Sequence, residues 1–79
     1  MKIKVMYFAV LREQAKKSDE ILEISFTNPR DIYNYLKRKY NFSLEISELK
    51  VAVNDCYEDF DIELKEMDSL VFIPPVAGG

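Results

Sequence analysis

The chain is 79 residues long, the length of one small domain; 48% of its residues are hydrophobic and 32% are charged. This balance is typical of a folded globular domain and excludes a disordered one. The formal net charge is −3, and the only run of three basic residues is Lys37-Arg38-Lys39. We interpret that run as favourable charge at the end of a helix, so no nucleic-acid partner is expected.

The cysteine count and the absence of a long apolar run bear on where the protein works. The single cysteine, Cys56, cannot form an internal disulfide, which indicates a reducing compartment. No stretch approaches the ~18 apolar residues of a membrane span, and no small-residue cleavage site follows the opening segment. We therefore expect a cytoplasmic protein without a membrane partner.

The first part of the chain alternates between strand and helix patterns. Residues 2–8 alternate apolar and polar positions and predict a strand. Residues 9–17 switch to helix-forming residues with one apolar side. Residues 21–26 alternate again and predict a second strand.

A second helix is predicted to begin after Asn28 and to run to Tyr40. Asn28 can cap this helix, and Pro29 suits its first position because proline lacks an N–H group. Asn41 is suited to the left-handed conformation that commonly follows a helix.

The second half of the chain contains mainly strand patterns. Residues 42–49 have weak periodicity and predict a connection, whereas residues 50–54 predict a strand and residues 56–57 the start of a short returning strand. Residues 69–73 predict the last strand, in which every position after Ser69 is apolar. A strand that is apolar on both faces lies in the centre of a sheet or has one face covered by a partner.

These elements predict an α+β fold with a mixed sheet of four to five strands and one main helix packed across it. Placing the last strand in the middle of the sheet beside the first gives a β-grasp, or ubiquitin-like, fold. The periodicity alone also leaves a ferredoxin-like sandwich open. No linker divides the chain, so we expect residues 1–79 to form one domain, with residues 75–79 as an extended tail.

Few residues of the body have the chemistry of a catalyst. There is no histidine, and the only glycines are Gly78 and Gly79, so the chain lacks an imidazole base and a glycine-rich phosphate loop. Acidic pairs such as Asp59 and Asp61 are typical of solvated surfaces. The acidic neighbours of Cys56 disfavour its thiolate, and we interpret it as a small, partly buried strand residue.

The candidate functional segment is the tail, Pro74-Pro75-Val76-Ala77-Gly78-Gly79. A Gly-Gly end can enter a channel that is too narrow for other residues. The two prolines favour an extended form, and the residues from Pro75 to Gly79 can reach roughly 16 Å. The Gly79 carboxylate can attack the α-phosphate of ATP to form an acyl-adenylate, with catalytic groups supplied by another protein. A mobile end without a function is the alternative.

The chain resembles the MoaD group of the MoaD/ThiS sulfur-carrier family, the small subunits of molybdopterin synthase. The specific match is the closing pattern Phe-x-Pro-Pro-Val-x-Gly-Gly over residues 72–79. Supporting matches are Tyr7-Phe8-Ala9, Leu11-Arg12-Glu13 and Val53-Asn54. The resemblance covers the whole chain and implies a β-grasp fold.

The resemblance implies a carrier that binds no cofactor permanently. An E1-like, MoeB-like activating enzyme would consume ATP to adenylate Gly79, and the product would become a C-terminal thiocarboxylate. The tail would then enter a large, MoaE-like subunit and pass its sulfur to cyclic pyranopterin monophosphate, within a heterotetramer that has two small subunits. We expect Phe72 and part of the neighbourhood of the opening strand to line the interface with this partner, and burial in the core is the alternative for Phe72.

Two loops depart from the family pattern. Lys16-Lys17-Ser18 and Glu66-Met67-Asp68 stand where family members often carry a glycine, so Met67 is expected to be strained if its turn needs a positive φ. Three other functions stay open: a ThiS-like carrier for thiamine thiazole synthesis, a ubiquitin-like modifier joined to lysines, and a passive binding module.

Overall fold

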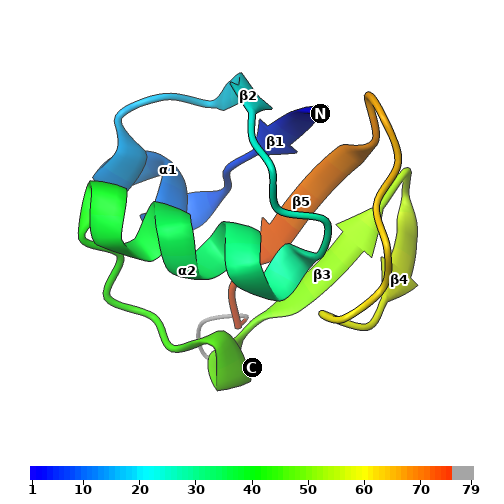
Figure 1. Ribbon diagram of the computed structural model, residues 1–79. Coiled ribbons are helices and arrows are strands. Elements are labelled where there is room, and N and C mark those ends of the chain that lie inside the picture. Colours follow the sequence, from blue (N-terminus) through cyan, green and yellow to red (C-terminus); the bar gives the residue numbers. More distant parts are fainter. Residues whose placement is uncertain (76–79) are drawn as a thin grey trace.

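The computed structural model describes residues 1–75, which form a five-stranded mixed sheet with α2 lying across it (Figure 1). In chain order the elements are β1 (Lys2–Met6), α1 (Ala9–Ala15), β2 (Asp19–Glu23), α2 (Pro29–Tyr40), the 3-10 turn η1 (Ile46–Glu48), β3 (Lys50–Val53), β4 (Cys56–Glu58) and β5 (Ser69–Ile73). No helix of the described part is long and apolar enough to cross a membrane.

The last strand lies in the middle of the sheet, whose order is β2-β1-β5-β3-β4. β5 pairs in parallel with β1 and antiparallel with β3. The parallel pairing requires a long connection between the first and last strands, and α2 lies within that connection (Figure 1). This is the arrangement predicted for a β-grasp fold, and it accounts for the apolar sequence of β5.

The start and end of α2 confirm the capping prediction. The side chain of Asn28 accepts a hydrogen bond of 2.8 Å from the backbone N–H of Asp31, and Pro29 is the first helical residue. The basic run Lys37-Arg38-Lys39 lies in the last turn, where it complements the helix dipole. Asn41 ends the helix with a φ of 60°.

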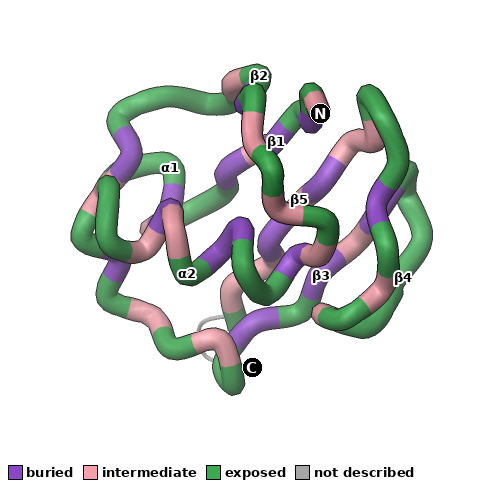
Figure 2. Tube along the Cα trace, in the orientation of Figure 1, coloured by how far each residue is buried: buried purple, intermediate pink, exposed green. Residues whose placement is uncertain are grey.

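The core lies between the sheet and the helices, as the buried segments in Figure 2 show. Tyr33 of α2 meets Phe72 of β5 edge to face, with ring centroids 5.0 Å apart, and Phe60 stacks on the same ring at 6.3 Å. Phe72 is 0% exposed. The prediction that Phe72 lines a partner interface is therefore wrong, because its side chain points from the central strand into the helix layer.

The predicted helix and strand boundaries near the N-terminus differ from the structure by a few residues. α1 ends at Ala15, earlier than predicted, because Lys16 takes a left-handed φ of 61°. The second strand begins at Asp19 and ends at Glu23, earlier than predicted. Its antiparallel pairing with β1 sets these ends, because Asp19 lies opposite Met6 and Glu23 lies opposite Lys2. Such boundaries depend on tertiary pairing, which a single strand's periodicity does not contain.

Candidate docking face and tail root

The helices cover one face of the sheet and leave the opposite face without a covering element in residues 1–75 (Figure 1). In β5, Leu70 and Phe72 are fully buried against the helices, whereas Val71 and Ile73 are only partly buried. Side chains alternate along a strand, so Val71 and Ile73 lie on the opposite face. We call the side of the sheet that carries Val71 the open face.

A row of apolar side chains, which we call the apolar row, crosses four strands of the open face in register: Met6, Val71, Ala52 and Tyr57. Phe8, Ile73 and the acidic residue Asp55 join these residues around a hollow of about 330 Å³. Phe8 is 45% exposed and Tyr57 is 71% exposed. Contiguous exposed apolar side chains with exposed aromatic groups are typical of a protein–protein docking surface.

The tail leaves the sheet beside the apolar row. Ile73 is the last residue of β5 and is followed by Pro74, which is half-buried, and Pro75, which is exposed. A second hollow, of about 270 Å³, lies at this point and is lined by Glu48, Lys50, Tyr57, Ile73, Pro74 and Pro75. We call it the tail-root hollow. Tyr57 and Ile73 line both hollows, so a protein that covers the open face also reaches the root of the tail.

The structure thus places some of the predicted site residues and not others. Pro74 and Pro75 lie at the tail-root hollow as described, whereas the predicted residues Val76, Ala77, Gly78 and Gly79 lie outside the described residues. Val71, Ile73 and Tyr57 were not predicted from the sequence as site residues. Strand alternation contained the signal for the first two, because a strand with Phe72 facing inward must direct its neighbours outward.

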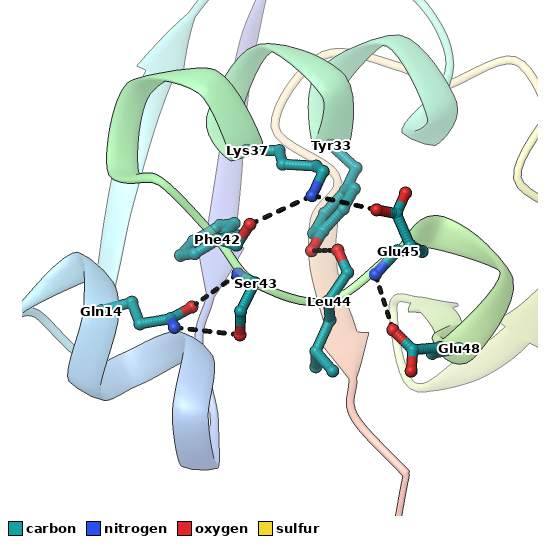
Figure 3. Close-up of polar contacts among 8 residues, drawn as sticks. All are labelled: Gln14, Tyr33, Lys37, Phe42, Ser43, Leu44, Glu45 and Glu48. Atoms are coloured by element: carbon teal, nitrogen blue, oxygen red, sulfur yellow. Dashed lines mark hydrogen bonds and ion pairs between the residues drawn. The ribbon is translucent and has the colours of Figure 1, made fainter.

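The connection between α2 and β3, residues 42–49, contains one short helical turn, η1. Polar contacts hold this connection in place (Figure 3). The hydroxyl of Tyr33 donates a hydrogen bond of 2.8 Å to the carbonyl of Leu44, and the ammonium of Lys37 donates one of 3.1 Å to the carbonyl of Phe42. Both donors come from α2, so the helix fixes the path of the connection across the end of the sheet.

Other hydrogen bonds from side chains hold the same connection at Ser43 and Glu45. The amide of Gln14 donates to the Ser43 hydroxyl (3.1 Å) and accepts from the Ser43 backbone N–H (3.2 Å) (Figure 3). The backbone N–H of Glu45 donates to Oε2 of Glu48 (2.7 Å). Burial, together with the charges of Glu45 and Glu48, raises the pKa of Tyr33 to about 12, so its hydroxyl remains a donor at neutral pH. These contacts hold Glu48 at the wall of the tail-root hollow.

Glu20 of β2 connects three parts of the fold. Its Oε2 accepts hydrogen bonds from the hydroxyls of Tyr7 (2.5 Å) and Tyr40 (2.6 Å), and its Oε1 lies 3.4 Å from the ammonium of Lys17. Burial raises the pKa of Glu20, but the hydrogen bonds from Tyr40 and Tyr7 and the charge of Lys17 outweigh burial and lower it. Tyr7 directly precedes Phe8, so this cluster fixes the chain where Phe8 reaches the open face.

Cys56 is exposed on the edge strand β4, so the prediction of a partly buried cysteine is wrong. β4 pairs only with β3 and lies at the end of the sheet order, where its residues are all exposed. Within residues 1–75, no group of three or more histidine, cysteine, aspartate or glutamate side chains is arranged to hold a metal ion.

Comparison with known proteins gives full-length matches. The chain is 30% identical over 80 residues to the molybdopterin synthase sulfur carrier subunit of Escherichia coli (strain K12), covering 98% of this chain and 99% of that protein. Molybdopterin converting factor subunit 1 from Pyrococcus furiosus superposes with a TM-score of 0.78 at 29% identity, covering 96% of this chain and 99% of that one.

A third match concerns the fold alone. The complex of subunits 1 and 2 of molybdopterin-converting factor from Helicobacter pylori contains a chain that matches with a TM-score of 0.70 at 21% identity, covering 100% of both chains. The model of the ThiS family matches residues 5–79, which is nearly the whole chain. The chain therefore belongs to the ThiS family, within the MoaD/ThiS group of sulfur carriers.

Proposed function

We propose that this chain is the sulfur-carrier subunit of a molybdopterin synthase. Its C-terminal Gly79 is adenylated and converted to a thiocarboxylate, which donates sulfur to cyclic pyranopterin monophosphate in molybdenum cofactor biosynthesis. The observation that carries the proposal is the continuity between the apolar row and the tail-root hollow, because Tyr57 and Ile73 belong to both. The full-length likeness to the sulfur carrier subunit of Escherichia coli supports the choice of pathway.

The chemistry requires activation of the tail by a second protein. A C-terminal carboxylate has a pKa of about 3.3–3.7, so it is ionised at neutral pH and is a poor acylating agent. Its oxygen attacks the α-phosphate of ATP and releases pyrophosphate, which leaves an acyl-adenylate. Hydrosulfide, delivered by the sulfur donor, then displaces AMP at the carbonyl carbon and loses its proton, and its sulfur remains on the carrier as the thiocarboxylate. An E1-like activating enzyme supplies the catalytic groups and consumes the ATP. We assign this reaction to the cytoplasm, because a single cysteine indicates a reducing compartment.

The open face and the tail have separate roles in this proposal. The large, MoaE-like subunit docks on the apolar row, where Tyr57 and Phe8 offer the exposed aromatic groups that commonly dominate interface energies. The Gly-Gly end then enters the active site of that subunit, because glycine lacks a Cβ and fits a narrow channel. In the synthase assembly, a heterotetramer, each small subunit acts as a co-substrate with the sulfur at its end.

The proposal is tested by weighing the intact protein after incubation with ATP, an E1-like activating enzyme and a sulfur donor. We expect the mass increase of a single oxygen-to-sulfur exchange, located at Gly79 by fragmentation. Lysine-linked adducts in place of this exchange indicate a ubiquitin-like modifier. An unchanged mass with an activating enzyme that is active on its own carrier contradicts the proposal and favours a passive binding module.

A second assay separates the two carrier pathways. The thiocarboxylate form is mixed with the large subunit and cyclic pyranopterin monophosphate, or with a thiazole synthase and its substrates. We expect the carrier to lose its sulfur and molybdopterin to form only in the first mixture. Sulfur transfer only in the second mixture supports the ThiS-like alternative.

A further inference from the structure

A lysine that forms no ion pair with any of the described residues 1–75 stands at the root of the tail. Lys50 is the first residue of β3, is exposed, and lies directly opposite Ile73 in the pairing with β5. Its side chain lines the tail-root hollow together with Tyr57, Pro74 and Pro75. Lys50 therefore lies at a hollow whose other lining residues are mostly apolar, with Glu48 as the exception, next to the point where the tail departs.

None of the carboxylates around Lys50 forms an ion pair with it within the described residues. The ion pairs among residues 1–75 are Lys17–Glu20, Arg30–Asp61 and Lys37–Glu45, and none of them includes Lys50. Glu48 lines the same hollow, but its carboxylate accepts the backbone N–H of Glu45 and closes the capping box of η1. Glu58 and Asp59 share a neighbouring groove with Lys50 without forming an ion pair to it.

Docking on the open face changes the surroundings of this ammonium. A partner that covers Tyr57 and Ile73 also covers the tail-root hollow, because both residues line it. Water is then removed from one side of Lys50. Partial burial of a charge is costly unless an opposite charge replaces the lost water. An anionic group of the docking surface beside Lys50 would replace this lost solvation, since no described carboxylate forms an ion pair with Lys50.

We infer that Lys50 is a specificity-determining residue that receives a carboxylate of the docking subunit, placed beside an apolar patch that covers Tyr57 and Ile73. The inference rests on the proposed function, since it takes the large synthase subunit as the occupant of the open face. Charge complementarity at the rim of an interface acts mainly on the association rate and on the choice of partner. Lys50 thus selects an acidic partner where the Gly-Gly end must be guided into its channel.

The test measures binding of the cognate large subunit to Lys50→Glu, with Lys50→Arg and Lys4→Glu as matched variants. Lys4 is an exposed lysine on the same face of the sheet, in β1, opposite Ile21 and Ser69. Both glutamate variants change the net charge equally, from −3 to −5 (−3 − 2). We expect Lys50→Glu to weaken binding roughly tenfold, mostly through a slower association rate at low salt, and Lys50→Arg to bind as the unchanged protein does.

Two results overturn the inference. One is that Lys50→Glu binds as tightly as the unchanged protein, and the other is that Lys4→Glu weakens binding as much as Lys50→Glu does. Circular dichroism and thermal unfolding show that each variant is folded before its binding is compared. A Tyr57→Ala variant distinguishes failure of the inference about Lys50 from failure of the proposed function. If Tyr57→Ala loses affinity while Lys50→Glu does not, docking on the open face stands and only the role of Lys50 is wrong.

Discussion

At the scale of single residues, the chain places several non-glycine residues in a left-handed backbone conformation. Lys16 has a φ of 61° and Met67 a φ of 64°. Both lie in the loops where the family resemblance implies a glycine. A Cβ atom in this conformation crowds the backbone and costs roughly 1–2 kcal/mol. The expectation that Met67 is strained if its turn needs a positive φ is therefore supported by this backbone angle.

Met67→Gly should stabilise the fold by about 0.5–1 kcal/mol, because it removes the strain while the added flexibility of the unfolded chain offsets part of the gain. Met67 is 50% exposed, so little packing is lost. Thermal and denaturant unfolding measure the change. Glu13→Gly, in the right-handed helix α1, is the matched control and should destabilise by about 1 kcal/mol. A destabilised Met67→Gly variant contradicts the strain argument.

Glu20→Gln should destabilise the protein at neutral pH by about 1–2 kcal/mol, because a neutral amide accepts the hydrogen bonds of Tyr7 and Tyr40 more weakly. The pKa of Glu20 is lowered in the folded state, so its contribution is present above the ordinary carboxyl pKa and is lost as the pH falls through the folded-state pKa. The stability difference between the two proteins should therefore shrink in acid. Unfolding curves across that pH range check it, with Glu23→Gln as an exposed control on the same strand.

At the scale of helices and strands, the sequence predicts those element ends that are set by residues close to them in the chain. α2 was predictable because Asn28, Pro29 and Asn41 act within a few residues of the helix ends. The apolar sequence of β5 left open a central strand or a partner on one face, and the structure places β5 in the centre of the sheet. The end of α1 and the start of β2 were not predictable in the same way, because a left-handed Lys16 and the pairing with β1 set them.

The open face shows a second limit of sequence reasoning. An apolar β5 was compatible with a partner on one side, but the sequence did not say which of its residues faces that side. Selection of Phe72 was wrong because the side of the sheet that the helices cover is a tertiary property. Once α2 packs on Phe72, Val71 and Ile73 are left for the open face.

Tyr57→Ala should weaken binding of the large subunit by about 2 kcal/mol, or roughly thirtyfold, because tyrosine is a frequent hot-spot residue and Tyr57 borders both hollows. Its side chain is 71% exposed, so the stability should change by less than about 0.5 kcal/mol. Titration calorimetry measures the binding. Ile21→Ala, another exposed apolar residue on the opposite edge strand β2, is the control and should bind nearly normally. Equal losses for both variants argue against the apolar row as the centre of the interface.

At the scale of the whole molecule, the residues that stabilise the fold differ from those proposed to dock on a partner and to carry the sulfur. The buried core consists of residues between Ile3 and Phe72, and the described chain reaches Pro75 beyond it. Helices occupy one face of the sheet, and the open face on the other side leads to the tail-root hollow. Changes at the end of the chain should therefore affect sulfur transfer without affecting the core.

Removal of Gly79 should abolish sulfur transfer and leave the unfolding temperature within about one degree, since the described core runs from Ile3 to Phe72 and changes at a chain terminus usually alter stability little. The shortened chain still ends in a glycine carboxylate, Gly78. A loss of sulfur transfer would therefore result from the shorter tail and not from a change in the terminal group. A Gly79→Ala variant keeps the length but adds a Cβ, and it should transfer sulfur slowly because the channel must admit a wider end. Intact mass and product formation measure transfer, and circular dichroism follows unfolding. Full transfer by the shortened chain, or unfolding caused by the deletion, contradicts the separation of tail and core.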